Sequence, residues 1–312
     1  MEKRSVIKVV GIGGGGANVI ARLVEEKIQG VELIAINSDV QDLRSKKADL
    51  KIQIGYKLTK GLGTGMNPRL GQKCAEFSQG RIQAALKGSD IVFLVFGAGG
   101  GTGTGAAPVI AKIIDKETLV IAVATTPFPF EGGVRKKVAN LGLKKLEKEV
   151  NALLVISNSQ LLEAAGEQAS VDEAFRLGEE VLLKAVKGVS DLVTSSGFVN
   201  LDLASLKTFM EKAGPVLFGV ASARGPSRIN QAIYQALHSP LLTIPVEKAR
   251  GALLNIASAG DLKISEFQKA TQIVADNLRP GAELVFGTSV DSSLGGGWVR
   301  VTVIVSGFRP ES

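Results

Sequence analysis

Short, mostly apolar runs alternate with amphipathic stretches over the first half of the chain. The runs at Val6–Val10, Leu33–Ile36, Ile91–Phe96, Leu119–Ala124 and Leu153–Ile156 are typical of strands buried on both faces. The stretches near 16–28, 70–87, 106–115 and 134–149 have the apolar spacing of helices that cover a sheet. This alternation predicts a doubly wound, Rossmann-like α/β domain, in which ligand loops follow the carboxyl ends of the strands.

A long amphipathic stretch separates this half from the rest. From Val171 to Thr194, apolar residues recur at steps of three or four, as on a helix packed along its length. Further strands are predicted at Val216–Ser222, Gly251–Ala257, Leu284–Val290 and Val299–Ser306, with helices near 227–238 and 265–277. The last strand alternates in part, which predicts a half-buried position. We expect a first domain over 1–170, a central helix over 171–197 and a second α/β domain over 198–312.

Composition narrows the possible chemistry. The chain has 312 residues, 45% of them hydrophobic, with one cysteine and one histidine. Cys74 alone excludes an intramolecular disulfide and a CxxC metal site, and His238 alone excludes HExxH and His-rich metal clusters. His238 falls near the predicted end of a helix, where packing or dipole compensation is a simpler role than catalysis. Much of the glycine, 37 copies in all, falls in bursts directly after predicted strands.

Charge and hydropathy limit the partners. The formal net charge is +7, but aromatic residues make up only 5% of the chain and do not interleave with the basic groups. No nucleic-acid binding is expected, because a stacking platform for bases is missing. The N-terminal segment has no apolar signal core and no apolar run is long enough to cross a bilayer. We therefore expect a cytoplasmic protein without direct membrane insertion.

A glycine-rich loop follows the first predicted strand and opens a helix. It reads GIGGGGAN over 11–18 and satisfies GxGxxG at Gly11, Gly13 and Gly16. Glycines let the backbone approach phosphate oxygens, and a helix N-terminus adds N–H donors and a positive dipole. With Asp39 after the second strand, as a ribose-binding acid, this loop alone would suggest an NAD(P) oxidoreductase. A tight strand-to-helix turn without a ligand is the structural alternative.

A second glycine-rich loop changes that interpretation. GAGGGTGTG over 97–105 follows the predicted strand IVFLVF and opens another helix. A dinucleotide-binding domain needs one such phosphate turn, whereas two of them can clasp a triphosphate chain, with hydroxyls from Thr102 and Thr104. No GxxxxGK[ST] sequence occurs, so the chain is not a P-loop NTPase. The two loops together predict binding of a purine nucleoside triphosphate.

At this second loop the chain resembles the tubulin/FtsZ superfamily, whose signature is GGGTGTG. The surrounding residues, GAGGGTGTGAAPVIA, are more similar to FtsZ than to tubulin. Further motifs extend the resemblance through nearly the whole chain: AINSDVQDL (35–43), LTKGLGTGMNP (58–68), TPFPFEGGVR (126–135), NLDLASLKTFM (200–210), SPLL (239–242) and RVTVIVSGF (300–308). The resemblance implies a tubulin/FtsZ-like α/β fold, in which a long central helix joins a Rossmann-like GTP-binding domain to a second α/β domain.

The resemblance also implies a role for each residue that matches a family motif. Phosphate and ribose contacts fall on Gly13, Gly14, Gly15, Gly16, Asn18, Gly99, Gly100, Gly101, Thr102, Gly103 and Thr104, and the loop that senses the γ-phosphate contains Thr64, Gly65 and Asn67. Further nucleotide contacts fall on Pro127, Glu131, Arg135 and Asn158, and Phe175 stacks on the base. Without the resemblance, Phe175 and its neighbours would be interpreted as core and a solvated helix face.

One base-reading position departs from the family pattern. Four residues after Phe175 the family usually carries Asp or Asn, and this chain has Glu179. A carboxylate can accept hydrogen bonds from the N1–H and the amino group of guanine, which adenine does not offer. We therefore expect GTP or GDP rather than an adenine nucleotide.

A second departure concerns hydrolysis. The family loop that enters the nucleotide site of the next subunit reads N-x-D-F-A-D, and this chain has Asn200-Leu201-Asp202-Leu203-Ala204-Ser205. Because the two family acids position and polarise the attacking water, the resemblance implies that Asn200 and Asp202 are catalytic in trans and that Ser205 replaces the second acid. Losing a general base typically costs about 10²–10⁴-fold in rate. Nucleotide binding and polymerisation are expected to survive, with slow hydrolysis.

The resemblance implies a self-assembling GTPase that forms filaments in cell division, with Mg²⁺ or a monovalent cation beside the phosphates. Head-to-tail self-association would complete the site. The chain ends at Ser312, directly after the last predicted strand, where the family usually continues with a linker and an adaptor-binding peptide; adaptor binding is therefore in doubt. Two alternatives stay open: a GTP-bound scaffold or filament modulator without hydrolysis, and an NAD(P) oxidoreductase.

Overall fold

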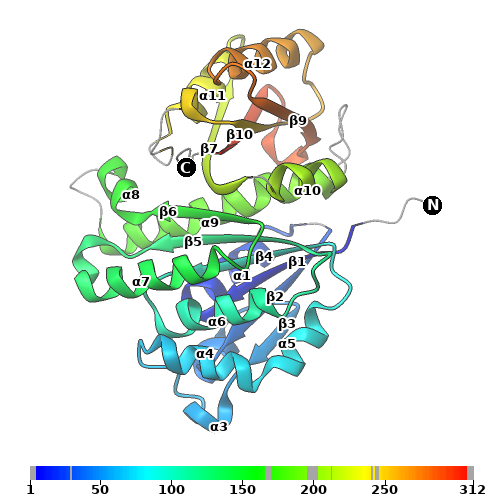
Figure 1. Cartoon of the computed structure of the whole chain (residues 1–312). Helices are drawn as coiled ribbons and strands as arrows, with labels where there is room; N and C mark the ends of the chain where they lie inside the picture. The colour runs from blue at the N-terminus through cyan, green and yellow to red at the C-terminus, as the bar shows by residue number, and fades with distance from the viewer. Residues whose placement is uncertain are drawn as a thin grey trace. The chain divides into compact units, whose positions relative to one another are not determined.

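The computed structural model describes residues 5–28, 30–165, 170–194, 203–211, 213–239, 242 and 246–307. The chain divides into two compact units, Met1–Val186 and Lys187–Ser312 (Figure 1). The division falls inside the long helix α9 (Val171–Thr194), whose bounds match those predicted from its apolar spacing.

Six parallel strands form the sheet of the first unit, in the order β3-β2-β1-β4-β5-β6. They are β1 (Ile7–Ile12), β2 (Val31–Asn37), β3 (Leu50–Gln53), β4 (Ile91–Gly97), β5 (Leu119–Thr126) and β6 (Ala152–Ser157). The strand order reverses between β1 and β4, and in such sheets a ligand crevice lies at the carboxyl ends of the strands beside the reversal. The predicted doubly wound α/β fold is confirmed.

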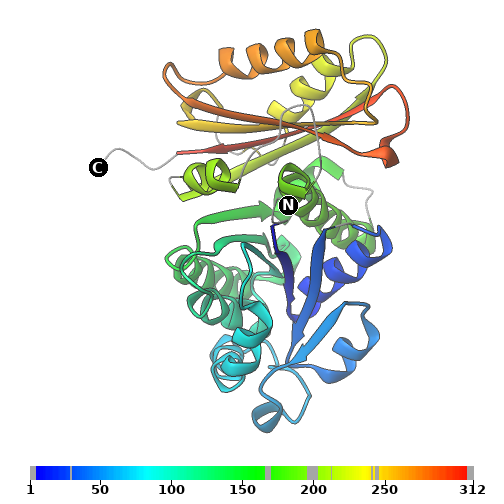
Figure 2. The same cartoon turned by 90° about the vertical axis from the view of Figure 1, so that its right-hand side faces the viewer.

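Helices cover both faces of this sheet, with the blue α1 on the face opposite the cyan and green helices α4, α6 and α7 (Figure 2). The helices are α1 (Gly13–Glu25), α2 (Val40–Ser45), α3 (Tyr56–Thr59), α4 (Pro68–Phe77), α5 (Gln79–Leu86), α6 (Gly101–Lys112), α7 (Gly133–Leu146) and α8 (Asn158–Ala165), with a 3₁₀ turn at Pro129–Glu131. Both α1 and α6 begin earlier than predicted, because the glycine loops themselves form the first helical turns.

The stretch predicted as one helix over 70–87 is two helices, α4 and α5, which meet at Ser78. The backbone of Ser78 leaves the helical region, and its hydroxyl accepts a hydrogen bond from the N–H of Gly55 at 3.0 Å. This hydrogen bond ties the junction between the two helices to the segment before α3.

The second unit contains four strands in the order β7-β10-β8-β9. Its elements are α10 (Leu203–Glu211), β7 (Gly214–Arg224), α11 (Arg228–Leu237), β8 (Gly251–Ser258), α12 (Ile264–Asp276), β9 (Glu283–Val290) and β10 (Trp298–Ser306), with 3₁₀ turns at Val246–Lys248 and Ser292–Leu294. Strand β10 is antiparallel to β7 and β8, and β9 is parallel to β8. Helices α11 and α12 cover one face over an apolar core that includes Ile233, Val274 and Val303 (Figure 2).

Strand β10 is more buried than its partial alternation predicts. From Val301 to Ser306 every residue is buried. The face away from α11 and α12 is covered by the end of α9, where a Cβ on Gly188 would lie 2.8 Å from the Cγ2 of Thr302. Two covered faces remove the need for a polar side of the strand.

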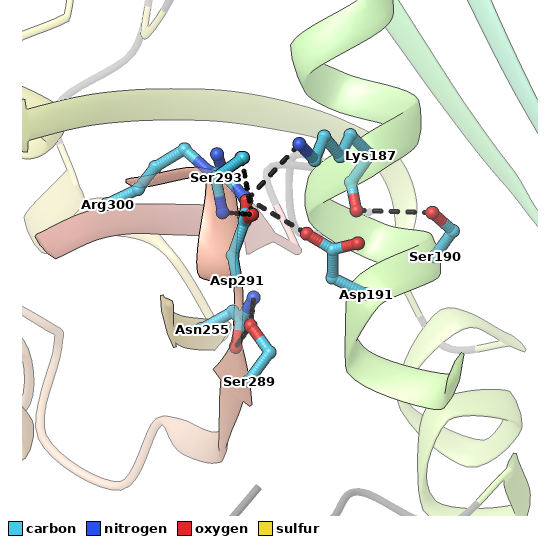
Figure 3. A network of polar contacts seen from close by, with 8 residues as sticks. All are labelled: Lys187, Ser190, Asp191, Asn255, Ser289, Asp291, Ser293 and Arg300. Atoms are coloured by element: carbon cyan, nitrogen blue, oxygen red, sulfur yellow. Dashed lines mark hydrogen bonds and ion pairs between the residues drawn. The ribbon is translucent and has the colours of Figure 1, made fainter. Parts of the chain in front are cut away.

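Four charged side chains join the end of α9 to β10 and the turn before it (Figure 3). The Arg300 guanidinium donates to Asp191 at 3.1 Å and to Asp291 at 2.7 Å, and Lys187 pairs with Asp291 at 3.2 Å. Burial raises the pKa of Asp191 to about 6, against the attraction of Arg300 and Lys187. Burial opposes ionisation of Asp291 as well, but hydrogen bonds from Ser293 and Arg300 and the two cations hold its pKa below the ordinary value.

The raised pKa of Asp191 predicts a pH-dependent stability. The native state keeps this proton in a window, from the ordinary 3.8 to about 6, in which the unfolded chain has lost it. The contribution of Asp191 to the free energy of unfolding is therefore largest below pH 3.8, decreases as the pH rises through the window, and is lost above about pH 6. Asp191→Asn keeps a neutral acceptor for Arg300 and should remove this dependence.

Urea unfolding of the wild type and Asp191→Asn at about pH 5 and about pH 7 measures the effect. We expect the wild type to gain about 1–1.5 kcal/mol relative to the variant at the lower pH, because about one pKa unit of the window lies between the two pH values. An equal difference between the two proteins at both pH values would contradict the assignment.

Candidate functional site

A cavity of about 410 Å³ lies where β1 and β4 end, at the reversal of the parallel sheet. This volume falls within the roughly 300–1,000 Å³ that is usual for small-molecule sites. Most of the site residues predicted from sequence line it: Gly13, Gly14, Gly15, Asn18, Thr64, Gly100, Gly101, Thr102, Gly103, Pro127, Glu131, Arg135, Asn158, Phe175 and Glu179. The fold thus brings together residues from six separate segments of the first unit.

Two helix N-termini open on this cavity. Helix α1 follows Ile12 and helix α6 follows Gly100, and neither of these residues caps its helix with a side-chain hydrogen bond. The first N–H groups of a helix have no partner within the helix, and the helix dipole makes that end positive. Two sets of N–H donors therefore meet at one cavity, which favours an anionic ligand such as a phosphate chain.

Glycine is required where the two loops approach other backbone. A Cβ on Gly101 would lie 2.2 Å from the Oγ1 of Thr64 and 2.7 Å from the backbone N of Asn67. Gly13 has φ +72°, and a Cβ there would lie 3.1 Å from the backbone N of Gly103. Any larger residue at these positions would displace the segments that form the cavity wall.

Three hydroxyl groups meet at the start of α6. The Oγ1 of Thr102 lies 2.7 Å from the Oγ of Ser38 and 3.2 Å from the Oγ1 of Thr64. All three side chains are buried. Hydroxyl groups can donate or accept, so this cluster can reorient its protons toward an anion at the helix starts.

Another part of the cavity wall carries an ion pair and two unsatisfied groups. Arg135 pairs with Glu131, whose other carboxylate oxygen accepts from the backbone N–H of Phe128 at 2.8 Å. The Nε of Arg135 and the Oδ1 of Asn158 are buried without a hydrogen-bond partner in the described part of the chain. Buried polar groups are nearly always paired, so these two atoms are suited to a polar ligand.

An aromatic side chain and a carboxylate complete this wall. Phe175 is 42% exposed, and its ring lies edge-on to Phe128 and Phe130, with ring centroids 5.0 Å and 6.1 Å away. One turn along α9, the Oε1 of Glu179 accepts from the Nδ2 of Asn18 at 2.7 Å. The amide thus orients Glu179 beside an exposed ring, an arrangement that suits a flat heterocycle with N–H groups along one edge.

Three residues that were predicted as contacts, Gly16, Gly99 and Thr104, have structural roles in this fold. A Cβ on Gly16 would lie 2.3 Å from the carbonyl oxygen of Val95, so this glycine lets α1 pack on β4. The Oγ1 of Thr104 accepts from the N–H of Gly99 at 2.8 Å, which closes the second loop on itself. Neither Gly16 nor Thr104 nor Gly99 lines the cavity.

Two predicted residues in the segment before α4 also have structural roles. The Asn67 side chain accepts from the N–H groups of Arg69 and Leu70, so it caps α4. Gly65, with φ +53°, shapes the turn between Asn67 and Thr64. Of the three residues predicted in this loop, only Thr64 lines the cavity.

Some lining residues were not predicted. They are Thr125, Thr126, Gly178 and Leu182, whereas Ile12, Met66, Gly97 and Ala98, which also line the cavity, belong to the predicted phosphate loops. Thr125 and Thr126 end β5, next to β4, so the rule that ligands lie at strand ends near the reversal could have identified them. A Cβ on Gly178 would lie 3.1 Å from the Oδ1 of Asn158, which shows that the missing side chain makes room for this amide.

The predicted catalytic residues are in the other unit of the chain. Asn200 and Asp202 lie outside the described residues. Ser205 is described: it is exposed in the first turn of α10 and borders a separate cavity of about 430 Å³ with Thr208 and residues of β9.

The residues that suggested other functions have structural contacts. Asp39 caps α2, accepting from the N–H groups of Gln41 and Asp42, and it does not line the cavity. His238 ends α11, where its ring stacks on Tyr234 at 4.1 Å. In the described ranges, no three His, Cys, Asp or Glu side chains gather as a metal site would require. No described helix is both long enough and apolar enough to traverse a bilayer.

Comparisons with known proteins agree with this geometry. Residues 6–166 match the "Tubulin/FtsZ family, GTPase domain", and residues 214–309 match the "FtsZ family, C-terminal domain". The structure is similar to an empty FtsZ dimer from M. jannaschii, with 41% identity, 99% of this chain and 90% of that chain covered and a TM-score of 0.94. It also shares the fold of GDP-bound CetZ1 from Haloferax volcanii, at 24% identity over 97% of this chain and 94% of that chain, with a TM-score of 0.83.

Proposed function

Because this chain belongs to the tubulin/FtsZ family of GTP-binding cytoskeletal GTPases, we propose that it binds GTP in the cavity at the starts of α1 and α6 and assembles head to tail into filaments. The filaments act in the cytoplasm in cell division, and their GTP hydrolysis is slow. The observation that carries the proposal is the meeting of two uncapped helix N-termini at one cavity. Self-association is supported by similarity to an FtsZ dimer and to a CetZ2 protofilament.

The residues present suit a guanine nucleotide from end to end. The helix starts, with Thr102 and Thr64, suit the phosphates, and the unsatisfied Nε of Arg135 can donate to the nucleotide. Phe175 offers a ring face for the base, with Asn158 and Glu179 at its polar edge. Mg²⁺ or a monovalent cation would be held largely by phosphate oxygens and water, in keeping with the way Mg²⁺ binds in nucleotide sites.

Base recognition by Glu179 gives the first test. Glu179→Gln removes the charge that strengthens hydrogen bonds from guanine and should weaken GTP binding about 10- to 100-fold. The preference for GTP over ATP should shrink with it. The matched control is Glu180→Gln, because Glu180 is paired with Lys184 at 2.6 Å and does not line the cavity. Competition against a fluorescent GTP analogue measures both; equal effects of the two substitutions would refute the role of Glu179.

The catalytic half of the proposal rests on Asn200, Asp202 and Ser205 from the next subunit. Asp202 would position and polarise the attacking water with Asn200 beside it, and Ser205 would leave the second acid missing. Since phosphoryl transfer depends mainly on positioning and electrostatics, hydrolysis should be slow and filaments long-lived.

A second candidate is a GTP-bound scaffold or filament modulator without hydrolysis, which Ser205 favours because a neutral hydroxyl is no base. An NAD(P) oxidoreductase is disfavoured because Asp39, the residue that suggested it, is a helix cap. Competition with GTP, GDP, ATP and NAD(P)H tests the nucleotide directly. We expect displacement by GTP and GDP alone; displacement by NAD(P)H and not by GDP would overturn the proposal.

A further inference from the structure

A larger cavity, of about 970 Å³, lies in the first unit apart from the nucleotide cavity. It is a groove with α6 as its floor and α4 and α7 as its walls, and these three helices are neighbours in Figure 1. Thr104 and Gly105 lie at one end, and Ile113 to Lys116, after α6, lie at the other. No residue lines both this groove and the nucleotide cavity.

Glycines hold the three helices close together at one end of the groove. A Cβ on Gly105 of α6 would lie 2.0 Å from the carbonyl oxygen of Pro68, and a Cβ on Gly71 of α4 would lie 2.2 Å from that of Gly101. A Cβ on Gly142 of α7 would lie 2.2 Å from the Cγ2 of Thr104. These close contacts fix the helix walls, so the groove is built into the fold and does not depend on a mobile loop.

The groove has apolar surface along its floor and one wall. Val109, Ile113 and Ile114 pack on the core of the unit but are only partly buried. Leu141 of α7 is 65% exposed and borders the same space, as does Val138. Half-exposed aliphatic side chains gathered in a concavity form a surface that gains stability when another apolar group covers it.

The rim of the groove is basic. Lys112, Lys116, Lys145 and Lys148 line the groove and are exposed. None of them forms an ion pair within the ranges that the structure describes. The lining also includes Arg69 and three acids, Glu76, Asp115 and Glu149, so the basic side chains outnumber the acidic ones.

Helix α7 extends this charge beyond the groove. It carries Arg135, Lys136, Lys137, Lys144 and Lys145 and no acidic residue. Its last-turn lysines, like Lys112 in the last turn of α6, also offset a helix dipole, but that role does not account for the exposed apolar floor between them.

We propose that this groove binds an acidic amphipathic helix of a partner protein. The apolar side chains of the partner helix would pack against α6 and Leu141, and its carboxylates would face Lys112, Lys116, Lys145 and Lys148. An apolar stripe flanked by charge is how helices dock in grooves. The concave floor does not suit a lipid bilayer surface, which is met by projecting apolar residues. The lining contains no aromatic side chain, so it lacks the stacking platform of a single-stranded nucleic-acid site.

The probe is a fluorescent peptide of about 18 residues, roughly five helical turns, with leucine at helical i, i+3 and i+4 spacing and glutamate elsewhere. Its binding to the full chain with GDP present is followed by anisotropy. A peptide with lysine in place of every glutamate and a scrambled acidic peptide are compared with it. We expect only the amphipathic acidic peptide to bind well, and binding to weaken as NaCl rises from about 0.1 M to about 1 M.

Matched charge reversals locate the site. Lys112→Glu with Lys145→Glu should weaken binding about tenfold or more, whereas Lys248→Glu with Lys269→Glu, which changes the net charge equally on the second unit, should leave it unchanged. Leu141→Ser tests whether apolar contact contributes to binding in addition to charge attraction. Because Leu141 is exposed, it can be changed without disturbing the core. The net charge stays constant, and peptide binding should weaken.

Several results would overturn the proposal. One is failure of the acidic peptide to bind below about 1 mM, the range of negligible affinity. Others are equal binding by the scrambled peptide, an equal loss in both double variants, or no effect of Leu141→Ser. The chain could also bind phosphatidylserine vesicles or single-stranded DNA more tightly than the peptide. If the variant with Lys112→Glu and Lys145→Glu lost that binding, the groove would belong to a different class of ligand and the proposal would be overturned.

Discussion

Replacing Ser205 with aspartate is expected to raise the rate of GTP hydrolysis by the assembled protein by about 10²–10⁴-fold, the contribution typical of a positioned general base. Ser205 is exposed in the first turn of α10. A carboxylate in the first turn of a helix is favoured by the helix dipole, so Ser205→Asp should fold normally. Phosphate release per polymerised subunit, with GTP in excess, measures the change.

The matched control for this variant is Thr208→Asp. Thr208 is exposed on the same helix and borders the same cavity as Ser205, so the added charge is nearly equivalent but stands one turn away. Hydrolysis should stay at the wild-type rate in this control. Equal rates in the wild type and Ser205→Asp, with assembly intact in both, would mean that the missing acid does not limit turnover.

Gly101→Ala should weaken GTP binding by about 100-fold or more, the cost of removing a preorganised phosphate-binding contact. The added Cβ would lie 2.2 Å from the Thr64 hydroxyl and 2.7 Å from the Asn67 backbone N, so the start of α6 and the segment before α4 would be forced apart. Equilibrium binding of a fluorescent GTP analogue, beside a thermal unfolding curve, separates lost binding from lost folding.

Gly80→Ala is the control, because Gly80 also lies in the first turn of a helix, α5, and a Cβ there meets no atom within 4 Å. It should bind GTP as the wild type does and be slightly more stable, since alanine is the better helix former by about 1 kcal/mol. Wild-type GTP affinity in Gly101→Ala would show that the nucleotide does not contact the start of α6.

Much of the fold could be predicted because buried parallel strands have a distinctive pattern. Strands β4 and β5 are apolar along nearly their whole length, and each has a parallel neighbour on both sides. Strand β3 was missed, since it is only four residues long and lies at the sheet edge with Lys51 exposed. The break at Ser78 was missed because the apolar spacing continues across it, and the contact of Ser78 with Gly55 is distant in sequence.

The site could be predicted in outline but not in detail. The glycine loops indicated phosphate binding, and most predicted contact residues do line one cavity. Sequence could not separate glycines that face the cavity from those that allow close packing, because both kinds stand in one motif. Gly13 lines the cavity, whereas Gly16, three residues on, lies against Val95. The basic groove was not predicted either, since its lysines come together only when α6 and α7 pack.

Sedimentation of the purified chain with GTP, with GDP and with a non-hydrolysable GTP analogue, with phosphate release measured in the same samples, tests the central claim most directly. We predict pelleting with GTP and with the analogue but not with GDP, loss of pelleting in Gly101→Ala, and GTP pellets that persist because phosphate release is slow. The same amount of pelleted protein with and without GTP, or equal pelleting of Gly101→Ala, would contradict the account.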